Sequence, residues 1–179
     1  KQLIEKTEFN VIGLNNQTLL AQNNDELTKF RKEVAELNRK VDGSGRLISE
    51  AKDKLKLVEH AIRTYPGTNM DRLKDVDEIK IQLNECKVLL NGDWIKSKHQ
   101  FETEPGIAGR IGLVYYQLFT NTTGVTETQR NHKSVAEEEY IEFRKKLDAQ
   151  LIKIKEIEKE LSEAKIPYIK GKDENWKED

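Results

Sequence analysis

Cysteine, long apolar runs and net charge are all scarce in this sequence, and each scarcity excludes a class of protein. The single Cys86 leaves no partner for an internal disulfide. No segment approaches the run of about 18 apolar residues that a membrane-spanning helix needs, so we expect no membrane insertion. The formal net charge of −1 provides no basic field, so we do not expect nucleic acid or an anionic membrane as a partner.

Catalytic and metal-binding patterns are also missing. The histidines His60, His99 and His132 lie in three different segments, and no pair has the spacing of metal ligands. No serine stands in a nucleophile-elbow context. Carboxylates are abundant, but they fall on solvated helix faces with no apolar pocket evident. We therefore predict no catalytic residue, no metal and no cofactor for this chain.

An apolar stripe at helical spacing dominates the sequence. Hydrophobic residues make up 36% of the chain and charged residues 35%, so the core must be narrow. Steps of three and four residues over 27–65 are typical of a long helix that packs against other helices, and the one missing position holds the small Ser44. The stripe consists of Leu27, Phe30, Val34, Leu37, Val41, Ile48, Ala51, Leu55, Val58, Ile62 and Tyr65.

Three further helices follow the same rule. The last is long and nearly matches the first, running from Thr126 to about Lys165, and two shorter ones lie between them. Together they predict an all-α fold, an elongated antiparallel helical bundle with two long helices and a middle rod broken at 92–105. Their stripes are Leu73, Val76, Ile79, Leu83, Cys86 and Leu90; Ile107, Ile111, Val114 and Leu118; and Tyr140, Phe143, Leu147, Ile154, Ile157, Leu161 and Ala164.

Local signals set the expected helix ends. Asn24 or Asp25 is the expected N-cap of the first helix, which stops at Pro66. Thr68 or Asn69 is expected to cap the second helix, and a polar loop follows through Trp94, His99 and Phe101. Pro105 is expected in the first turn of the third helix. Thr126 and Gln129 have the spacing of a capping box at the start of the last helix.

Gly43 and Gly45 interrupt the first stripe, and two interpretations are open. Each glycine costs about 1 kcal/mol inside a helix, and Asp42 to Gly45 has the composition of a turn. The apolar stripe nevertheless resumes in phase at Ile48, which a turn has no reason to preserve. The pattern favours one continuous, bent helix about 60 Å long.

The ends of the chain differ from its centre, and we divide it at 1–24, 25–166 and 167–179. Residues 1–24 are expected to be an extended linker or the tail of a preceding β domain, with a short strand over 8–13 and a turn at 15–17; a disordered arm is the alternative. Residues 25–166 form the bundle, and 167–179 are a charged tail. The chain begins without Met, so we expect it to be a piece of a longer protein or a processed chain.

Two polar or glycine-rich segments have more than one interpretation. The small residues Pro105, Ala108, Gly109 and Gly112 favour close approach of a neighbouring helix, with an anion site at the helix N-terminus as the alternative. A polar set at one end of the rod is either a helix–helix junction or a contact surface for another domain. Within it, Arg130 sits unfavourably against the helix dipole and needs a carboxylate or helix-end carbonyls beside it. The candidate interdomain contact residues are Arg110, Gln117, Thr126, Gln129, Arg130 and His132.

The segments 109–112 and 124–130 carry a family resemblance. Gly109-Arg110-Ile111-Gly112 followed by Gly124-Val-Thr126-Glu-Thr128-Gln129-Arg130 resembles the C-terminal region of bacterial sortilin-like propeller proteins, large secreted proteins often labelled glycosyl hydrolases for their Asp-box repeats. Weaker similarity extends over most of 8–170. Val125, Glu127 and Tyr168 depart from the family pattern, and so do Gly43 and Gly45.

The resemblance implies a helical appendage to an upstream β-propeller, in a protein exported to the periplasm or the extracellular space. It transfers no functional residue. Our first hypothesis is a non-catalytic accessory or interaction domain, whose partner is that propeller. One alternative is part of a glycan- or peptide-hydrolysing enzyme with its catalytic residues in the propeller. Another is a self-associating coiled coil, which implies a homodimer.

Overall fold

The computed structural model describes residues 7–12, 23–120 and 123–166. These form five α-helices: α1 (Asn24–Thr64), α2 (Arg72–Asn91), α3 (Trp94–Lys98), α4 (Ile107–Thr120) and α5 (Glu127–Glu163). The described segments contain no β-strand, and the all-α prediction is confirmed. Residues 8–12 are exposed without regular structure, so the predicted strand is absent there. Gly13, the turn at 15–17 and the tail 167–179 lie outside the described residues.

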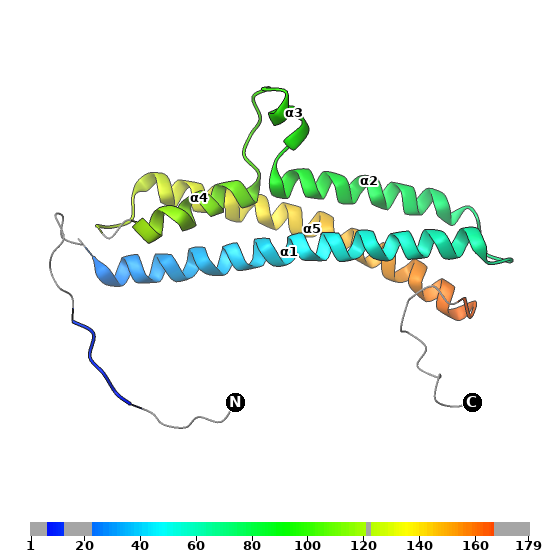
Figure 1. Cartoon of the computed structure of the whole chain (residues 1–179), viewed down its shortest axis with the longest axis horizontal. Helices are drawn as coiled ribbons and strands as arrows, with labels where there is room; N and C mark the ends of the chain where they lie inside the picture. The colour runs from blue at the N-terminus through cyan, green and yellow to red at the C-terminus, as the bar shows by residue number, and fades with distance from the viewer. Residues whose placement is uncertain (1–6, 13–22, 121–122, 167–179) are drawn as a thin grey trace.

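The helices form an elongated bundle of three rods that lie side by side along one axis (Figure 1). The long helices α1 and α5 are two of the rods, and α2 and α4 lie end to end as the third. Lys80 of α2 reaches Glu59 in the second half of α1, at 2.5 Å. Arg31 in the first half donates to the carbonyl of Leu118 in α4, at 2.9 Å. The predicted broken middle rod is therefore confirmed.

One continuous apolar core runs along the axis of the bundle, built from the predicted stripes. Helical periodicity places these side chains on one face of each rod, and the rods turn those faces toward each other. Tyr65 and Ala164 are exposed because each caps a helix end rather than lying inside the helix. Tyr140 and Leu73 are half-buried. None of the described helices has an apolar stretch long enough to cross a membrane.

Helix α1 continues through Gly43 and Gly45, as the stripe predicts. Ser44 between them is buried, and its hydroxyl lies 3.0 Å from the hydroxyl of Tyr140 on α5. The Tyr140 hydroxyl also donates to the carbonyl of Lys40, at 3.3 Å. The small serine thus fills the gap in the apolar stripe because a tyrosine from the facing helix reaches into that position.

Replacing Gly43 and Gly45 together with alanine is expected to raise the free energy of unfolding by about 1–2 kcal/mol, because each helix-interior glycine costs about 1 kcal/mol. An alanine methyl at 43 would meet no heavy atom within 4 Å beyond its own helical backbone, and one at 45 would lie 3.7 Å from Leu90, an ordinary contact. The thermal midpoint should rise by about 2–4 °C per kcal/mol for a chain of this size. Gly67→Ala is the control that should lower it, since Gly67 has φ +87°. A lower midpoint for the double variant would contradict the uninterrupted helix.

Several predicted helix ends are wrong in detail. The N-cap of α1 is Asn23, whose side chain accepts from the Glu26 N–H at 3.1 Å. Thr68 does not cap α2; its hydroxyl donates to the carbonyls of Ile62 and Tyr65 at the end of α1. The turn at 66–67 folds Thr68 back beneath those unpaired carbonyls, where a donor is needed.

The start of α2 and the start of α4 also differ from the prediction. Asp71 precedes α2 in helical conformation and makes no side-chain cap. Asn69 accepts from the Asp71 N–H instead, at 3.0 Å. Pro105 lies before α4 rather than inside its first turn, and the Gly106 carbonyl accepts the first helical hydrogen bond, from Arg110.

Candidate binding surface

The six predicted contact residues do not form one surface. Thr126, Gln129 and Gln117 are joined at the junction of α4 and α5. The Thr126 hydroxyl accepts from the Gln129 N–H at 3.3 Å, and the Gln129 side chain accepts from the Thr126 N–H at 3.0 Å, which confirms the capping box. Gln129 is buried and its amide group also donates to Gln117, at 3.4 Å. These polar groups are satisfied within the bundle.

The other three residues of the set point elsewhere. Arg130 pairs with Glu26 and lies 5.9 Å from the ring centroid of Phe30, both on α1. The carboxylate expected beside Arg130 is therefore present. Arg110 lies 3.2 Å from Glu139 of α5. The His132 Nδ1 atom is buried and makes no hydrogen bond with the described residues.

Thr126→Ala is expected to lower the free energy of unfolding by about 1 kcal/mol, because it removes one half of the capping box at the start of α5. Thr128→Ala is the matched control, since this exposed threonine lies within the first turn of the helix itself. Urea unfolding of both variants measures the difference. Equal stabilities would show that Thr126 does not fix the start of the helix.

A raised segment between α2 and α4 is the most prominent feature outside the rods. We call residues 93–105 the finger; it contains α3 and projects from the side of the bundle (Figure 1). Asp93 caps α3 by accepting from the Lys96 N–H at 3.0 Å. That hydrogen bond holds the pKa of the Asp93 carboxyl below its usual value. The sequence prediction of a polar loop here missed this helix.

The C-terminal end of α3 is capped without a glycine. Gln100 has φ 61°, and its N–H binds the Ser97 carbonyl at 3.0 Å. The next N–H, of Phe101, binds the Lys96 carbonyl at 3.1 Å. These are the two hydrogen bonds of a Schellman motif, which glycine usually provides at the left-handed position. The finger is thus a hydrogen-bonded structure and not an open loop.

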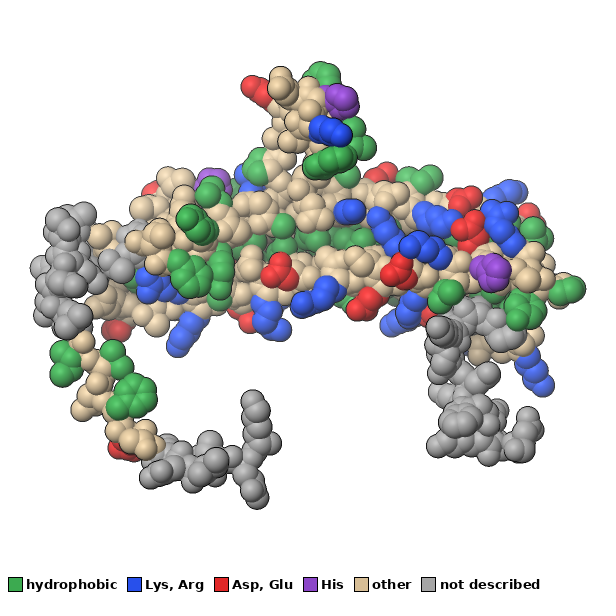
Figure 2. Space-filling view, in the orientation of Figure 1, with side chains coloured by type: hydrophobic (Ala, Val, Ile, Leu, Met, Phe, Trp, Pro, Cys, Tyr) green, Lys and Arg blue, Asp and Glu red, His purple; other side chains and the backbone are tan. Residues whose placement is uncertain are grey.

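Large apolar side chains of the finger face solvent. Trp94, Ile95 and Phe101 are 70%, 65% and 66% exposed. Figure 2 shows apolar side chains gathered on the raised segment, away from the core between the rods. The Lys98 ammonium lies 5.1 Å from the centroid of the Trp94 ring. These apolar side chains therefore contribute little to the core and are available to another surface.

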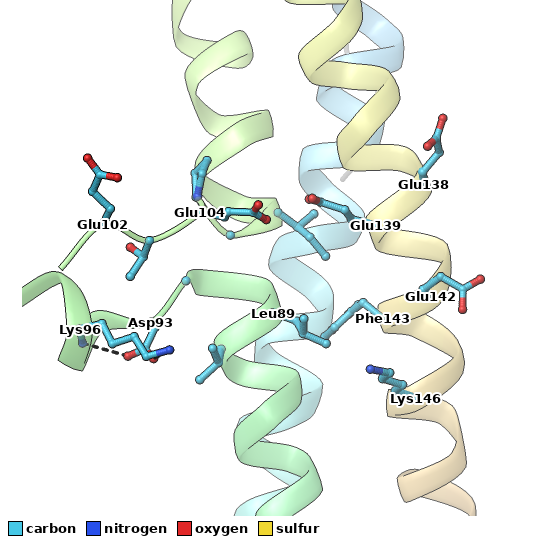
Figure 3. A pocket seen from close by; sticks show the side chains of 16 residues that line it. Leu89, Asp93, Lys96, Glu102, Glu104, Glu138, Glu139, Glu142, Phe143 and Lys146 are labelled. Carbon is cyan, nitrogen blue, oxygen red and sulfur yellow. Dashed lines mark hydrogen bonds and ion pairs between the residues drawn. The ribbon is translucent and has the colours of Figure 1, made fainter.

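A groove lies at the base of the finger, between the end of α2, the start of α4 and α5. Its volume is about 660 Å³. Leu89 and Phe143 approach each other across it, and the side chain of Lys146 extends toward α2 (Figure 3). A second hollow of about 490 Å³ shares Val88, Leu89 and Lys146 with the groove and adds Ile81. The two hollows thus adjoin the same stretch of α2.

Carboxylates surround this groove. Its lining holds six acidic residues and two lysines. Glu104 and Glu139 point toward each other, whereas Glu138 and Glu142 project from the outer side of α5 (Figure 3). Glu104 has no ion-pair partner among the described residues, and a hydrogen bond from Lys145 lowers the pKa of Glu142. The groove therefore favours a cationic group beside an apolar one.

The groove lining, drawn from the described residues, contains no histidine, serine or cysteine. Cys86, the single cysteine of the sequence, is buried in the core, and that burial raises the pKa of its thiol. In the described part of the chain no group of three or more His, Cys, Asp or Glu side chains could hold a metal ion.

A second apolar surface covers the outer face of α4. Leu113, Tyr116 and Phe119 are exposed, and Tyr115 packs edge-on against Phe119 with centroids 5.1 Å apart. A hollow of about 310 Å³ lies beside them, lined also by Arg31 of α1. This face lies near the junction end of the bundle, where α1 begins (Figure 1).

Sequence reasoning missed the finger, although a signal was present. Trp94, Ile95 and Phe101 are large apolar residues inside a segment otherwise rich in charge.

Comparison of the chain with known protein families, curated proteins and solved structures finds no match.

Proposed function

We propose that this chain is a non-catalytic interaction domain, a helical rod that holds an apolar finger toward another protein surface. The observation that carries the proposal is the exposure of Trp94, Ile95 and Phe101 on an element raised from the bundle. Burying a side chain of this kind contributes about 1.5–3 kcal/mol, and aromatic residues are enriched at the centres of protein interfaces. A finger used only as a connection would need none of them.

The family resemblance extends this proposal to the rest of the protein. An upstream β-propeller, in an exported bacterial protein, would join the chain at its N-terminal side. The start of α1 lies at the junction end, beside Arg130 and the apolar face of α4. We propose that the propeller contacts this end, which leaves the finger, farther along the rod, for a different surface.

Photo-crosslinking in the purified complete gene product tests the contact role of the finger. A photoreactive phenylalanine analogue replaces Trp94 or Phe101, and replaces the exposed Ile152 on α5 as the control. The expected result is a cross-link from positions 94 and 101 to a defined protein segment, and none from 152. The proposal fails if positions 94 and 101 cross-link no more than position 152.

The non-catalytic part of the proposal is tested on the chain alone. We expect no turnover when it is assayed against a panel of glycoside and peptide substrates. Turnover that disappears when a single groove carboxylate, such as Glu104 or Glu139, is changed to its amide would overturn it and favour the hydrolase alternative.

A further inference from the structure

We propose that the side of the bundle beside the finger binds a partner helix with a line of apolar residues flanked by lysine or arginine. The inference rests on the proposed function, because it takes the finger to be one edge of a contact surface. It adds the chemistry of the partner. We call this surface the α2 face; it comprises the residues that line the two hollows at Val88 and Leu89.

Helix α2 carries two lines of apolar residues, and only one of them is covered. The buried line belongs to the core between α2, α1 and α5. Ile81, Val88 and Leu89 form the second line and are 58%, 45% and 42% exposed. Ile81 and Val88 are two helical turns apart, so they share one side of the helix. A surface helix of a bundle normally has one apolar face, so the second line indicates a further packing partner.

The shape of the α2 face suits a helix laid along α2. The hollow of about 490 Å³ reaches from Ile81 to Leu89, and the groove of about 660 Å³ continues from Val88 to the break in the middle rod. The depressions therefore follow the axis of α2 for about three turns. Phe143 of α5 lines the groove as well, and the finger stands beside it (Figures 1 and 3). A helix that lays its apolar side into such a groove is a common mode of recognition.

The α2 face is more acidic than the chain as a whole. Its lining holds seven acidic residues and two lysines, a formal charge of −5, whereas the whole chain has −1. Arg110 and Lys145, outside the lining, pair with Glu139 and Glu142. Lys98 of the finger adds one more positive charge nearby, so this side of the molecule keeps a net charge of −2. The field over the exposed apolar line is therefore negative and attracts a cationic partner.

Four carboxylates of this side have no ion-pair partner among the described residues. They are Glu85, Glu102, Glu104 and Glu138. Glu85 lies between Ile81 and Val88 on α2, whereas the other three lie around the groove at the opposite end of the line. Lysine or arginine on the flanks of an apolar helix would meet these carboxylates while the apolar residues cover the line. An acidic helix of the same shape would be repelled.

Three synthetic helical peptides test the chemistry of the partner. The first is a fluorescein-labelled peptide of leucine and lysine, about five helical turns long, with leucine along one side. The second has glutamate in place of lysine, and the third has serine in place of leucine. Fluorescence anisotropy should show saturable binding of the first to the chain, and dissociation constants at least about tenfold higher for the other two. The proposal fails if the first peptide does not bind, or if either of the others binds equally well.

Variants outside the finger locate the bound peptide. E85Q/E138Q removes two of the unpaired carboxylates, and I81S/V88S removes the exposed apolar line without changing charge. Each should raise the dissociation constant of the leucine–lysine peptide about tenfold. The control E50Q/E156Q makes the same charge change at exposed residues away from the α2 face and should leave it within about twofold. Circular dichroism verifies that all variants are folded. A control that weakens binding as much as E85Q/E138Q, or an unchanged constant for I81S/V88S, overturns the proposal.

These failures are distinguishable from failure of the proposed function. If positions 94 and 101 cross-link in the complete gene product but the leucine–lysine peptide does not bind, the finger is a contact surface and its partner is not a basic helix. If the peptide binds the α2 face while positions 94 and 101 cross-link no more than position 152, the proposed function of the finger fails alone. Cross-links from 94 and 101 into a helix with lysine or arginine beside an apolar line support both.

Discussion

Phe143→Ala is expected to lower the free energy of unfolding by about 3–5 kcal/mol, the usual range for a buried phenylalanine truncated to alanine. The ring is 1% exposed and lies where the middle rod is broken, opposite Leu89 and 5.8 Å from the Tyr140 ring. A bundle of three rods has a single core layer, so no further layer of side chains can move into the cavity that the ring leaves. The cavity should therefore stay largely open, and the cost should fall near the upper part of that range.

Ile141→Ala provides the matched control two residues away on the same helix. Ile141 is 56% exposed, so its truncation removes little buried area and introduces a better helix former. Urea unfolding of both variants should show a large loss for Phe143 and a change within about 0.5 kcal/mol for Ile141. A loss below about 1 kcal/mol at Phe143 would mean that the rods close around the space more readily than this packing suggests.

The core was predictable because burial in a thin bundle depends on one property, the position of a residue around its helix. A side chain is buried only if it lies on the stripe, so spacing alone identifies Val34, Leu55 or Leu147 as core residues. The apolar stripe keeps the same helical phase on both sides of Ser44. What spacing could not show is why a serine stands there, since Tyr140 is 96 residues away in the sequence.

Helix ends were less predictable because several lack the expected residues. Gln100 and Lys165 take the left-handed conformation that glycine usually provides, with φ 61° and 53°. At five residues, α3 is too short to show periodicity, and its cap is Asp93, one of many acidic residues. Propensity gives no reason to choose a helix there, and the hydrogen bonds of the finger decide it.

The candidate sites divide in the same way between local and distant contacts. The capping box of Thr126 and Gln129 joins residues three apart, and the sequence alone was sufficient to find it. The pairing of Arg130 with Glu26 spans 104 residues, and the groove combines α2, α4 and α5. Such contacts depend on how far one rod is shifted along another, which a single sequence does not specify.

The glycine-rich start of α4 shows where a close approach is needed, and it is not where the sequence suggested. A methyl group added at Gly112 would meet no heavy atom within 4 Å beyond its own helical backbone, and one at Gly109 would lie 3.8 Å from Pro105. Neither glycine brings another helix close. Gly106 is different, because a methyl group there would lie 2.3 Å from the Gly92 nitrogen and 2.7 Å from the Leu90 carbonyl oxygen. The close approach is thus between the end of α2 and the start of α4.

Gly106→Ala is therefore expected to lower the free energy of unfolding by about 3 kcal/mol, at the upper end of the usual cost of overpacking. The atoms that would clash belong to the backbone, so no side-chain rotation can relieve them, and the two ends of the broken rod must separate. Those ends are also the base of the finger and one wall of the groove.

Gly112→Ala is the control for helix propensity, and it should leave stability unchanged or raise it by up to about 1 kcal/mol. Urea unfolding compares the two variants. If Gly106→Ala is as stable as the wild type, the ends of α2 and α4 are not held in contact, and the finger is not fixed at its base.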